Sequence, residues 1–212
     1  FICDVKGSSA YPEKAVLNAY LAVLNSVFSE KCLNILAPTI SFQTGDISRI
    51  PFSSKISQNR IIDRLVDECI LQSRLDWDAY ECSWDYKRHP LLCSQKKISA
   101  SYDKWEREAA QRFNALKVNE EELNRILIGI YNLQDELTPE VEDKDVTVRL
   151  ADAKLDIRSL ISYAVGCMFG RYSLDCEGLA YAGGEWDASK YSTIIPDKDN
   201  ILPICDDEYF ED

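Results

Sequence analysis

The chain has 212 residues, and its 46% hydrophobic content is enough to bury a core, which excludes disorder of the whole chain. Its formal net charge of −12 argues against general nucleic-acid binding, because phosphate contacts need Lys and Arg. The charge is uneven, however: residues 1–60 carry six Lys and Arg against four Asp and Glu, whereas residues 101–212 carry twelve against twenty-five. Any contact with a polyanion therefore belongs to the N-terminal part.

Cysteine spacing and hydropathy indicate the cellular compartment in which we expect the protein. The eight cysteines lie far apart without a Cys-x-x-Cys pair, which favours reduced thiols over disulfides or a metal site. The longest apolar run, 160–169, is shorter than the roughly 20 residues that cross a bilayer. We expect a cytoplasmic protein with no metal and no membrane partner. Because the chain starts at Phe1 without a methionine, we also expect it to be a fragment of a longer polypeptide.

The N-terminal part predicts one helix and a small β element. Short alternation over 1–12, followed by Gly, Ser and Pro, predicts a strand and a loop. Apolar residues at helical spacing predict a helix over 13–36, ended by Pro38. The segment 39–52 predicts a strand, a Thr44-Gly45-Asp46 turn and a second strand or extended segment.

The rest of the chain predicts helices. A long one begins at Ser57, and its apolar pattern can continue into 76–89. After a polar interval, one helix is expected around 105–116, and a capping box of Asn119 and Glu122 predicts the start of another. A last helix covers about 147–169 and ends at Gly170. We therefore expect a mainly α fold: a bundle-like helical region with the small β element near the N-terminus.

The stretch DWDAYECSWDYKRH, residues 76–89, raises the question of an active site. If the helix continues through it, the carboxylates at positions 78, 81 and 85 share one face, about 5–6 Å apart, which allows a two-carboxylate hydrolase mechanism. The same spacing aligns the rings at positions 77, 80 and 84, which is more typical of helix packing, with a partner-contact surface as the next alternative. We interpret His89, the only histidine, as structural or surface-exposed.

The chain contains no GxGxxG, GxxxxGK[ST], HExxH or GxSxG motif, so we assign no catalytic residue. Side chains able to hold phosphates or read base edges gather in the least acidic part of the chain. These candidate DNA-binding residues are Lys6, Ser8, Ser9, Thr39, Ser41, Gln43, Thr44, Arg49 and Lys55.

Several long stretches point to a family. They include FICDVKGSSAYP, AYLAVLNS, LNILAPTISFQTGDISRIPF, SQNRIIDRLVDECI, DWDAYECSWDYKRHPLL and KWEREAAQRFNALKVNEEELNRILIGIYNLQDEL. Together with ISYAVGCMFGRYSLD and the acidic end of the chain, they resemble the C-terminal region of adenine-specific DNA methyltransferases. The best match is the methyltransferase of the BREX phage-defence system, which is similar to fused type II restriction-modification enzymes.

The resemblance implies a non-catalytic part of such an enzyme. In the family, an upstream domain binds S-adenosylmethionine and holds the flipped adenine with an Asn-Pro-Pro-Tyr-type motif, and neither that motif nor the Gly-rich cofactor motif occurs here. Residues 1–55 would form the C-terminal part of a target-recognition domain, 56–172 a helical spacer or scaffold, and 173–212 an acidic irregular segment. No cofactor is expected in this chain, although the parent would use S-adenosylmethionine.

The implied partners are double-stranded DNA, the upstream methyltransferase domain of the same chain and other subunits of the defence system. The expected function is DNA recognition and scaffolding within a site-specific DNA adenine methyltransferase. The alternative is a helical protein–protein interaction module that docks the methyltransferase to partner subunits. A stand-alone hydrolase remains the third hypothesis.

Overall fold

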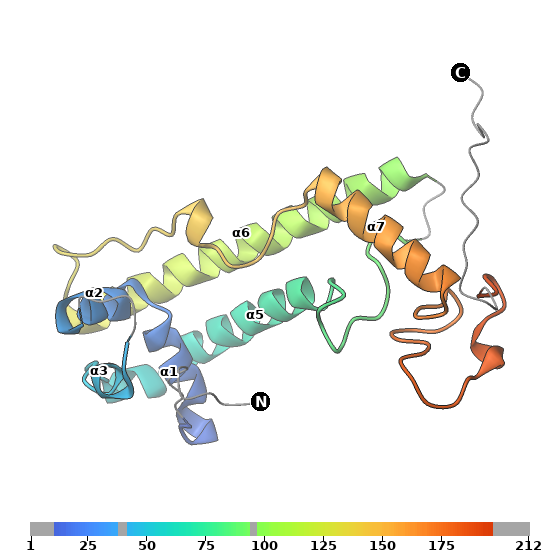
Figure 1. Cartoon of the computed structure of the whole chain (residues 1–212). Helices are drawn as coiled ribbons and strands as arrows, with labels where there is room; N and C mark the ends of the chain where they lie inside the picture. Colours follow the sequence, from blue (N-terminus) through green and yellow to red (C-terminus); the bar gives the residue numbers. More distant parts are fainter. Residues whose placement is uncertain (1–10, 38–41, 94–96, 197–212) are drawn as a thin grey trace. The chain divides into compact units, whose positions relative to one another are not determined.

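The computed structural model describes residues 11–37, 42–93 and 97–196, which are mainly helical (Figure 1). In chain order the elements are η1 (Lys14–Val16), α1 (Leu17–Leu24), α2 (Val27–Leu36), α3 (Thr44–Ile47), α4 (Ser54–Ser57), α5 (Arg60–Trp77), α6 (Ile98–Tyr131), η2 (Asp143–Asp145), α7 (Ala153–Met168) and η3 (Ala188–Lys190). No strand occurs in the described ranges. The mainly α prediction is thus confirmed.

The predicted small β element is not found in the part of the chain that the structure describes. Its first strand falls on residues 1–10, and the second begins at 38–41, both outside the described residues. The segment that follows folds as helix α3 where a turn and strand were expected. The Asp46 carboxylate accepts a hydrogen bond from the Gln43 N–H at 3.0 Å, which caps the helix start in place of a hairpin turn.

The helix predicted over 13–36 is interrupted after Leu24, and α2 begins anew at Val27. Ser26 ends the first helix, because its hydroxyl donates to the Val23 carbonyl at 2.6 Å and accepts from the Ser29 N–H. The Val27 N–H, which has no partner within its own helix, donates to the Asn124 side chain of α6 at 3.1 Å. A contact 97 residues away in sequence therefore stabilises this break.

Helices α5 and α6 also differ from the prediction at their ends. Asn59 caps α5 by accepting from the Ile61 N–H at 3.0 Å, so the helix starts three residues later than expected and ends at Trp77. The predicted boundary at Asn119 is wrong, because α6 runs through it without interruption. No Gly or Pro lies between Ile98 and Ile128, so nothing in the backbone breaks the helix there.

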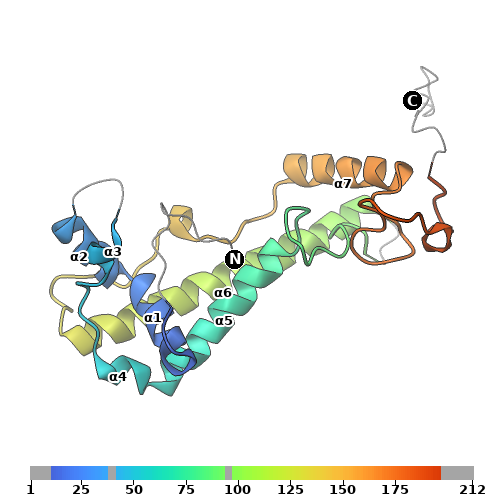
Figure 2. The ribbon, with the colours of Figure 1, turned by 60° about the horizontal axis from the view of Figure 1, so that its bottom comes forward.

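By its contacts the chain forms two compact units. Unit 1 contains the described residues up to Leu75 together with Ala110–Arg149, and unit 2 contains Asp76–Ala109 together with the described residues from Leu150 onward. The core of unit 1 lies between α1, α5 and the second half of α6, which run close together in both ribbon views (Figures 1 and 2). Its members with almost no exposure are Ala19, Val23, Ile56, Ile62 and Leu127.

Unit 2 is built around tyrosines. Tyr163 of α7 and Tyr172 are stacked with ring centroids 4.8 Å apart, and Tyr86 meets both rings edge-on. Gly166 allows this packing, since a Cβ there would lie 2.7 Å from the Tyr172 ring. Gly170, at φ +76°, ends α7 as predicted.

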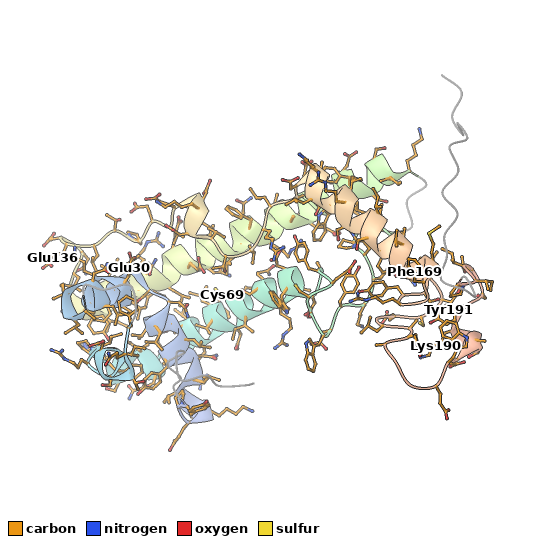
Figure 3. The ribbon with its side chains drawn as sticks, in the orientation of Figure 1. Glu30, Cys69, Glu136, Phe169, Lys190 and Tyr191 are labelled. Atoms are coloured by element: carbon orange, nitrogen blue, oxygen red, sulfur yellow. The ribbon has the colours of Figure 1, made fainter. Side chains whose placement is uncertain are left out.

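The described part of the C-terminal segment, residues 173–196, contains the short helix η3 and is tied together by Asp175. Its carboxylate accepts from the Ser192 and Thr193 N–H groups at 2.7 and 2.8 Å and from the Thr193 hydroxyl at 2.6 Å. Tyr191, labelled in Figure 3, is buried and donates to the Gly170 carbonyl at 2.5 Å. Apart from the short helix η3, this segment is therefore held by specific hydrogen bonds of side chains.

Replacing Asn124 by Ala should destabilise unit 1. The side chain is buried, accepts from the Val27 N–H and donates to the Pro139 carbonyl at 3.2 Å, so its loss leaves two backbone groups without a partner. The expected loss is about 1–3 kcal/mol of unfolding free energy, measured by urea denaturation. Asn114→Ala, at an exposed position of the same helix, is the matched control. Equal stability of the Asn124→Ala and Asn114→Ala variants would show that the hydrogen bonds of Asn124 do not stabilise unit 1.

Replacing Asp175 by Asn should loosen residues 173–193. The hydrogen bonds from Thr193 and Ser192 hold the pKa of Asp175 well below its usual range. The carboxylate therefore stabilises this segment above the ordinary aspartate pKa of about 4, and the contribution is lost as the pH falls below that value. Limited proteolysis at pH 7 should cut the segment several-fold faster in this variant than in Glu185→Gln, an exposed control. Unchanged cleavage would show that these bonds are not needed.

Candidate nucleic-acid interface

Four of the nine candidate DNA-binding residues lie in the described part of the chain: Gln43, Thr44, Arg49 and Lys55. All four are exposed and belong to one short segment of unit 1, residues 42–57, which connects α2 to α5. The other five, Lys6, Ser8, Ser9, Thr39 and Ser41, lie outside the described residues. The structure thus brings the described candidates onto one connecting segment.

Apolar anchors fix the backbone of this segment on the core of unit 1. Ile50 and Ile56 are buried, and Phe52 stacks on Tyr20 of α1 with ring centroids 4.4 Å apart. The Tyr131 hydroxyl of α6 donates to the Pro51 carbonyl at 2.6 Å. Anchored residues therefore alternate with exposed ones, which places the Arg49 and Lys55 side chains in solvent on a fixed backbone.

The charge of the segment is mixed. Asp46 lies between the candidates and keeps its carboxylate on the Gln43 N–H. Within the described part of the chain, neither Arg49 nor Lys55 makes an ion pair, so both charges are available for an external anion. Arg60, exposed at the start of α5, is a further cation that the sequence prediction omitted. The position of Arg60 on the solvent-facing side of the helical pattern is the sequence signal that could have identified this cation.

The structure does not support the helical alignment on which the hydrolase hypothesis depended. Helix α5 ends at Trp77, so Asp78, Glu81 and Asp85 do not form a row on a helix face. Asp78 accepts from the Ser83 hydroxyl at 2.6 Å, and Glu81 accepts from the Tyr172 hydroxyl at 3.3 Å.

The predicted stripe of aromatic rings in the same stretch is also wrong. Trp84 is fully exposed and Trp77 is half-exposed, whereas Tyr86, which was not singled out, is the buried ring. His89 is buried, as the structural interpretation allowed, and burial lowers its pKa to about 4. Its neutral imidazole accepts from the Leu91 N–H through Nδ1 at 3.2 Å.

Unit 1 also contains a mostly apolar cavity of about 280 Å³, lined by residues of α1, α5 and α6. Glu120 of α6 is an acidic side chain in its lining, and burial raises the pKa of this carboxyl to about 7. Cys69 of α5, labelled in Figure 3, lines the same cavity, and burial together with Glu120 raises its pKa to about 12. The thiol is therefore unreactive at neutral pH, which fits a packing role.

Replacing Glu120 by Gln should change the pH dependence of stability. The folded-state pKa lies above the ordinary glutamate value, so the charged side chain destabilises unit 1 most at pH values above about 7. Below the ordinary value of about 4, the penalty disappears. The variant should be more stable than the parent by at least about 1 kcal/mol at pH 8.5, since one pKa unit is 1.36 kcal/mol, and nearly equal at pH 4. Glu136→Gln, at an exposed position, is the control. A difference in unfolding free energy between Glu120→Gln and the parent that stays constant from pH 4 to pH 8.5 would contradict the raised pKa of Glu120.

The described residues contain no cluster of three or more His, Cys, Asp and Glu side chains that could bind a metal. Across the same residues, every helix is either too short or too polar to cross a membrane.

Comparison with known proteins shows that the chain is similar, over its entire length, to a segment of adenine-specific methyltransferases. It is 46% identical to adenine-specific methyltransferase PglX of Lacticaseibacillus casei (strain Zhang) and 31% identical to adenine-specific methyltransferase BrxX of Escherichia coli O9:H4 (strain HS). The chain spans only 18% and 19% of the length of these two relatives. No protein-family model matches the chain. The family resemblance drawn from the sequence is thus confirmed.

Proposed function

We propose that this chain is a DNA-recognition and scaffold part of an S-adenosylmethionine-dependent, adenine-specific DNA methyltransferase that acts in phage defence or restriction-modification. The observation that carries the proposal is the match of the whole chain to less than a fifth of two adenine-specific methyltransferases. A methyltransferase that extracts its target base from a duplex needs additional surfaces to hold the DNA. In this proposal the catalytic domain, with its cofactor site, belongs to the rest of the parent protein.

Within the chain, we assign the DNA contact to the N-terminal part. Arg49 and Lys55 are exposed, unpaired within the described part of the chain and carried on an anchored backbone, which suits contacts to phosphates. Residues 1–55 would complete a target-recognition domain, 56–172 would brace it, and the acidic residues 173–212 would make no contact with the DNA because like charges repel. The cytoplasm, where cellular DNA is accessible, is the proposed location.

One observation favours the alternative of a protein–protein interaction module. Ile161, Val165 and Met168 of α7 follow helical spacing and are each at least one-third exposed. An exposed apolar row of this kind is typical of a surface that binds another protein or domain. The upstream methyltransferase domain or another subunit of the defence system would be the partner.

The test is duplex DNA binding measured by fluorescence anisotropy. The affinity should fall steeply between about 50 and 200 mM salt, because phosphate contacts release counterions. Replacing Lys6, Arg49 and Lys55 together by Gln should weaken binding about tenfold or more at low salt and flatten the salt dependence. Lys144→Gln, at a lysine already paired with Glu142 in the same unit, is the control.

Two outcomes would contradict the assignment to DNA. Absence of binding at low salt favours the interaction module. Binding that the triple variant retains in full shows that Lys6, Arg49 and Lys55 do not make the DNA contact.

A further inference from the structure

Unit 2 contains a cavity of about 370 Å³ whose walls combine aromatic rings with charged groups. Its lining includes Glu81, Trp84, Tyr86, Arg171 and Tyr172. The cavity lies entirely within this unit, so its shape does not depend on the placement of unit 1. None of these residues belongs to the proposed DNA contact.

Two polar atoms in the wall of this cavity have no hydrogen-bond partner among the described residues. The Tyr86 hydroxyl is one, although the side chain is only 6% exposed, and the Oε1 atom of Glu81 is the other. The second oxygen of Glu81 already accepts from Tyr172. Buried polar atoms nearly always have partners, so two orphaned ones beside a single cavity indicate a missing hydrogen-bonding group.

The two atoms offer one donor and one acceptor. Burial and the nearby Glu81 raise the pKa of Tyr86, so its hydroxyl stays protonated and donates. The free oxygen of the Glu81 carboxylate accepts. A ligand that satisfies both must present a donor beside an acceptor, as the hydrogen-bonding edges of nucleobases do.

The remaining walls suit a planar ring. The Trp84 indole is fully exposed beside the cavity and can stack on a heterocycle. The Arg171 guanidinium lies over the Tyr172 ring, 5.4 Å from its centroid, and supplies a positive charge for a phosphate. The same guanidinium disfavours a lysine or other cationic ligand, because the cavity already holds a positive charge.

The wall that carries Glu81, Trp84 and Tyr86 belongs to residues 78–93, which contain turns but no helix or strand. Few backbone hydrogen bonds hold this wall, so it can shift to let a ligand reach the buried oxygens.

We propose that this cavity binds the base of a nucleotide or of an unpaired DNA strand, with Glu81 and Tyr86 on its hydrogen-bonding edge, Trp84 on its face and Arg171 on its phosphate. This site goes beyond the proposed function, since it lies in the other unit and does not require duplex binding. The pair of oxygens does not select among the four bases, because each base presents a neighbouring donor and acceptor.

The test is isothermal titration calorimetry of the 212-residue chain with the four deoxynucleoside 5′-monophosphates. At least one should bind with a Kd on the order of 0.1–1 mM, the range expected for a small ligand. Tyr86→Phe, which removes only the hydroxyl, and Glu81→Gln, which exchanges the acceptor, should each weaken binding about tenfold. Glu185→Gln, at an exposed carboxylate of the same unit, should leave binding unchanged.

Folding is checked independently. Tyr86→Phe removes a hydroxyl that has no partner in the free protein, so its unfolding midpoint should equal or exceed that of the parent. This makes loss of nucleotide binding distinguishable from loss of structure. Full binding by the Tyr86→Phe variant would overturn the assignment.

Three further results would also overturn it: no heat with any nucleotide, equal binding of ribose 5-phosphate, which would show anion binding to Arg171 alone, or preferred binding of n-butylamine as a mimic of a lysine side chain. Because the duplex experiment uses variants of Lys6, Arg49 and Lys55, failure of one proposal leaves the other intact.

Discussion

The row of buried side chains along helix α6, called its seam below, is the constraint on which the rest of the structure depends. Its buried apolar side chains follow helical spacing from Trp105 to Leu127, with the partly buried Glu120 at the position between Leu116 and Leu123, and they contribute to both units. Leu123 and Leu127 pack in the core of unit 1, and Phe113 and Leu116 cover Val146 and Val148 of the following loop. In unit 2 the Trp105 indole donates to the buried Asp156 carboxylate of α7 at 3.0 Å.

Polar side chains on this seam determine where neighbouring elements begin. Asn124 satisfies the first N–H of α2 and the Pro139 carbonyl, so one amide positions a helix start and a loop. Asp156, held by Trp105, also accepts from the Asp152 N–H at the start of α7. Each group is buried and hydrogen-bonded, because an unpaired one would cost free energy. The partnerless oxygens beside the unit 2 cavity depart from this rule, which is why they indicate a ligand.

The two candidate sites differ in how far the sequence predicted them. Arg49 and Lys55 were selected from residue type and local charge, and the structure shows that both are exposed on an anchored segment. The sequence does not predict the cavity in unit 2, although the stretch 76–89 is rich in carboxylates and aromatic rings. The apolar pattern allows a continued helix there, but Glu81 and Tyr86 meet Arg171 and Tyr172, about 90 residues away, through turns that have no periodic signal.

The sequence by itself determined the mainly α class, the helical character of α5, α6 and α7, the stop at Gly170 and the family resemblance, because apolar periodicity, glycine and long matching stretches are local signals. Only the tertiary structure decided that the 13–36 helix breaks at Ser26, that α6 continues through Asn119 and that 76–89 leaves the helix. Each depends on distant partners. The break at Ser26 depends on Asn124, and the continuation of α6 depends on the core around Leu123. The departure of 76–89 from the helix depends on the tyrosines of unit 2. Local propensity differs by less than about 1 kcal/mol per residue, so such burial and hydrogen bonds override it.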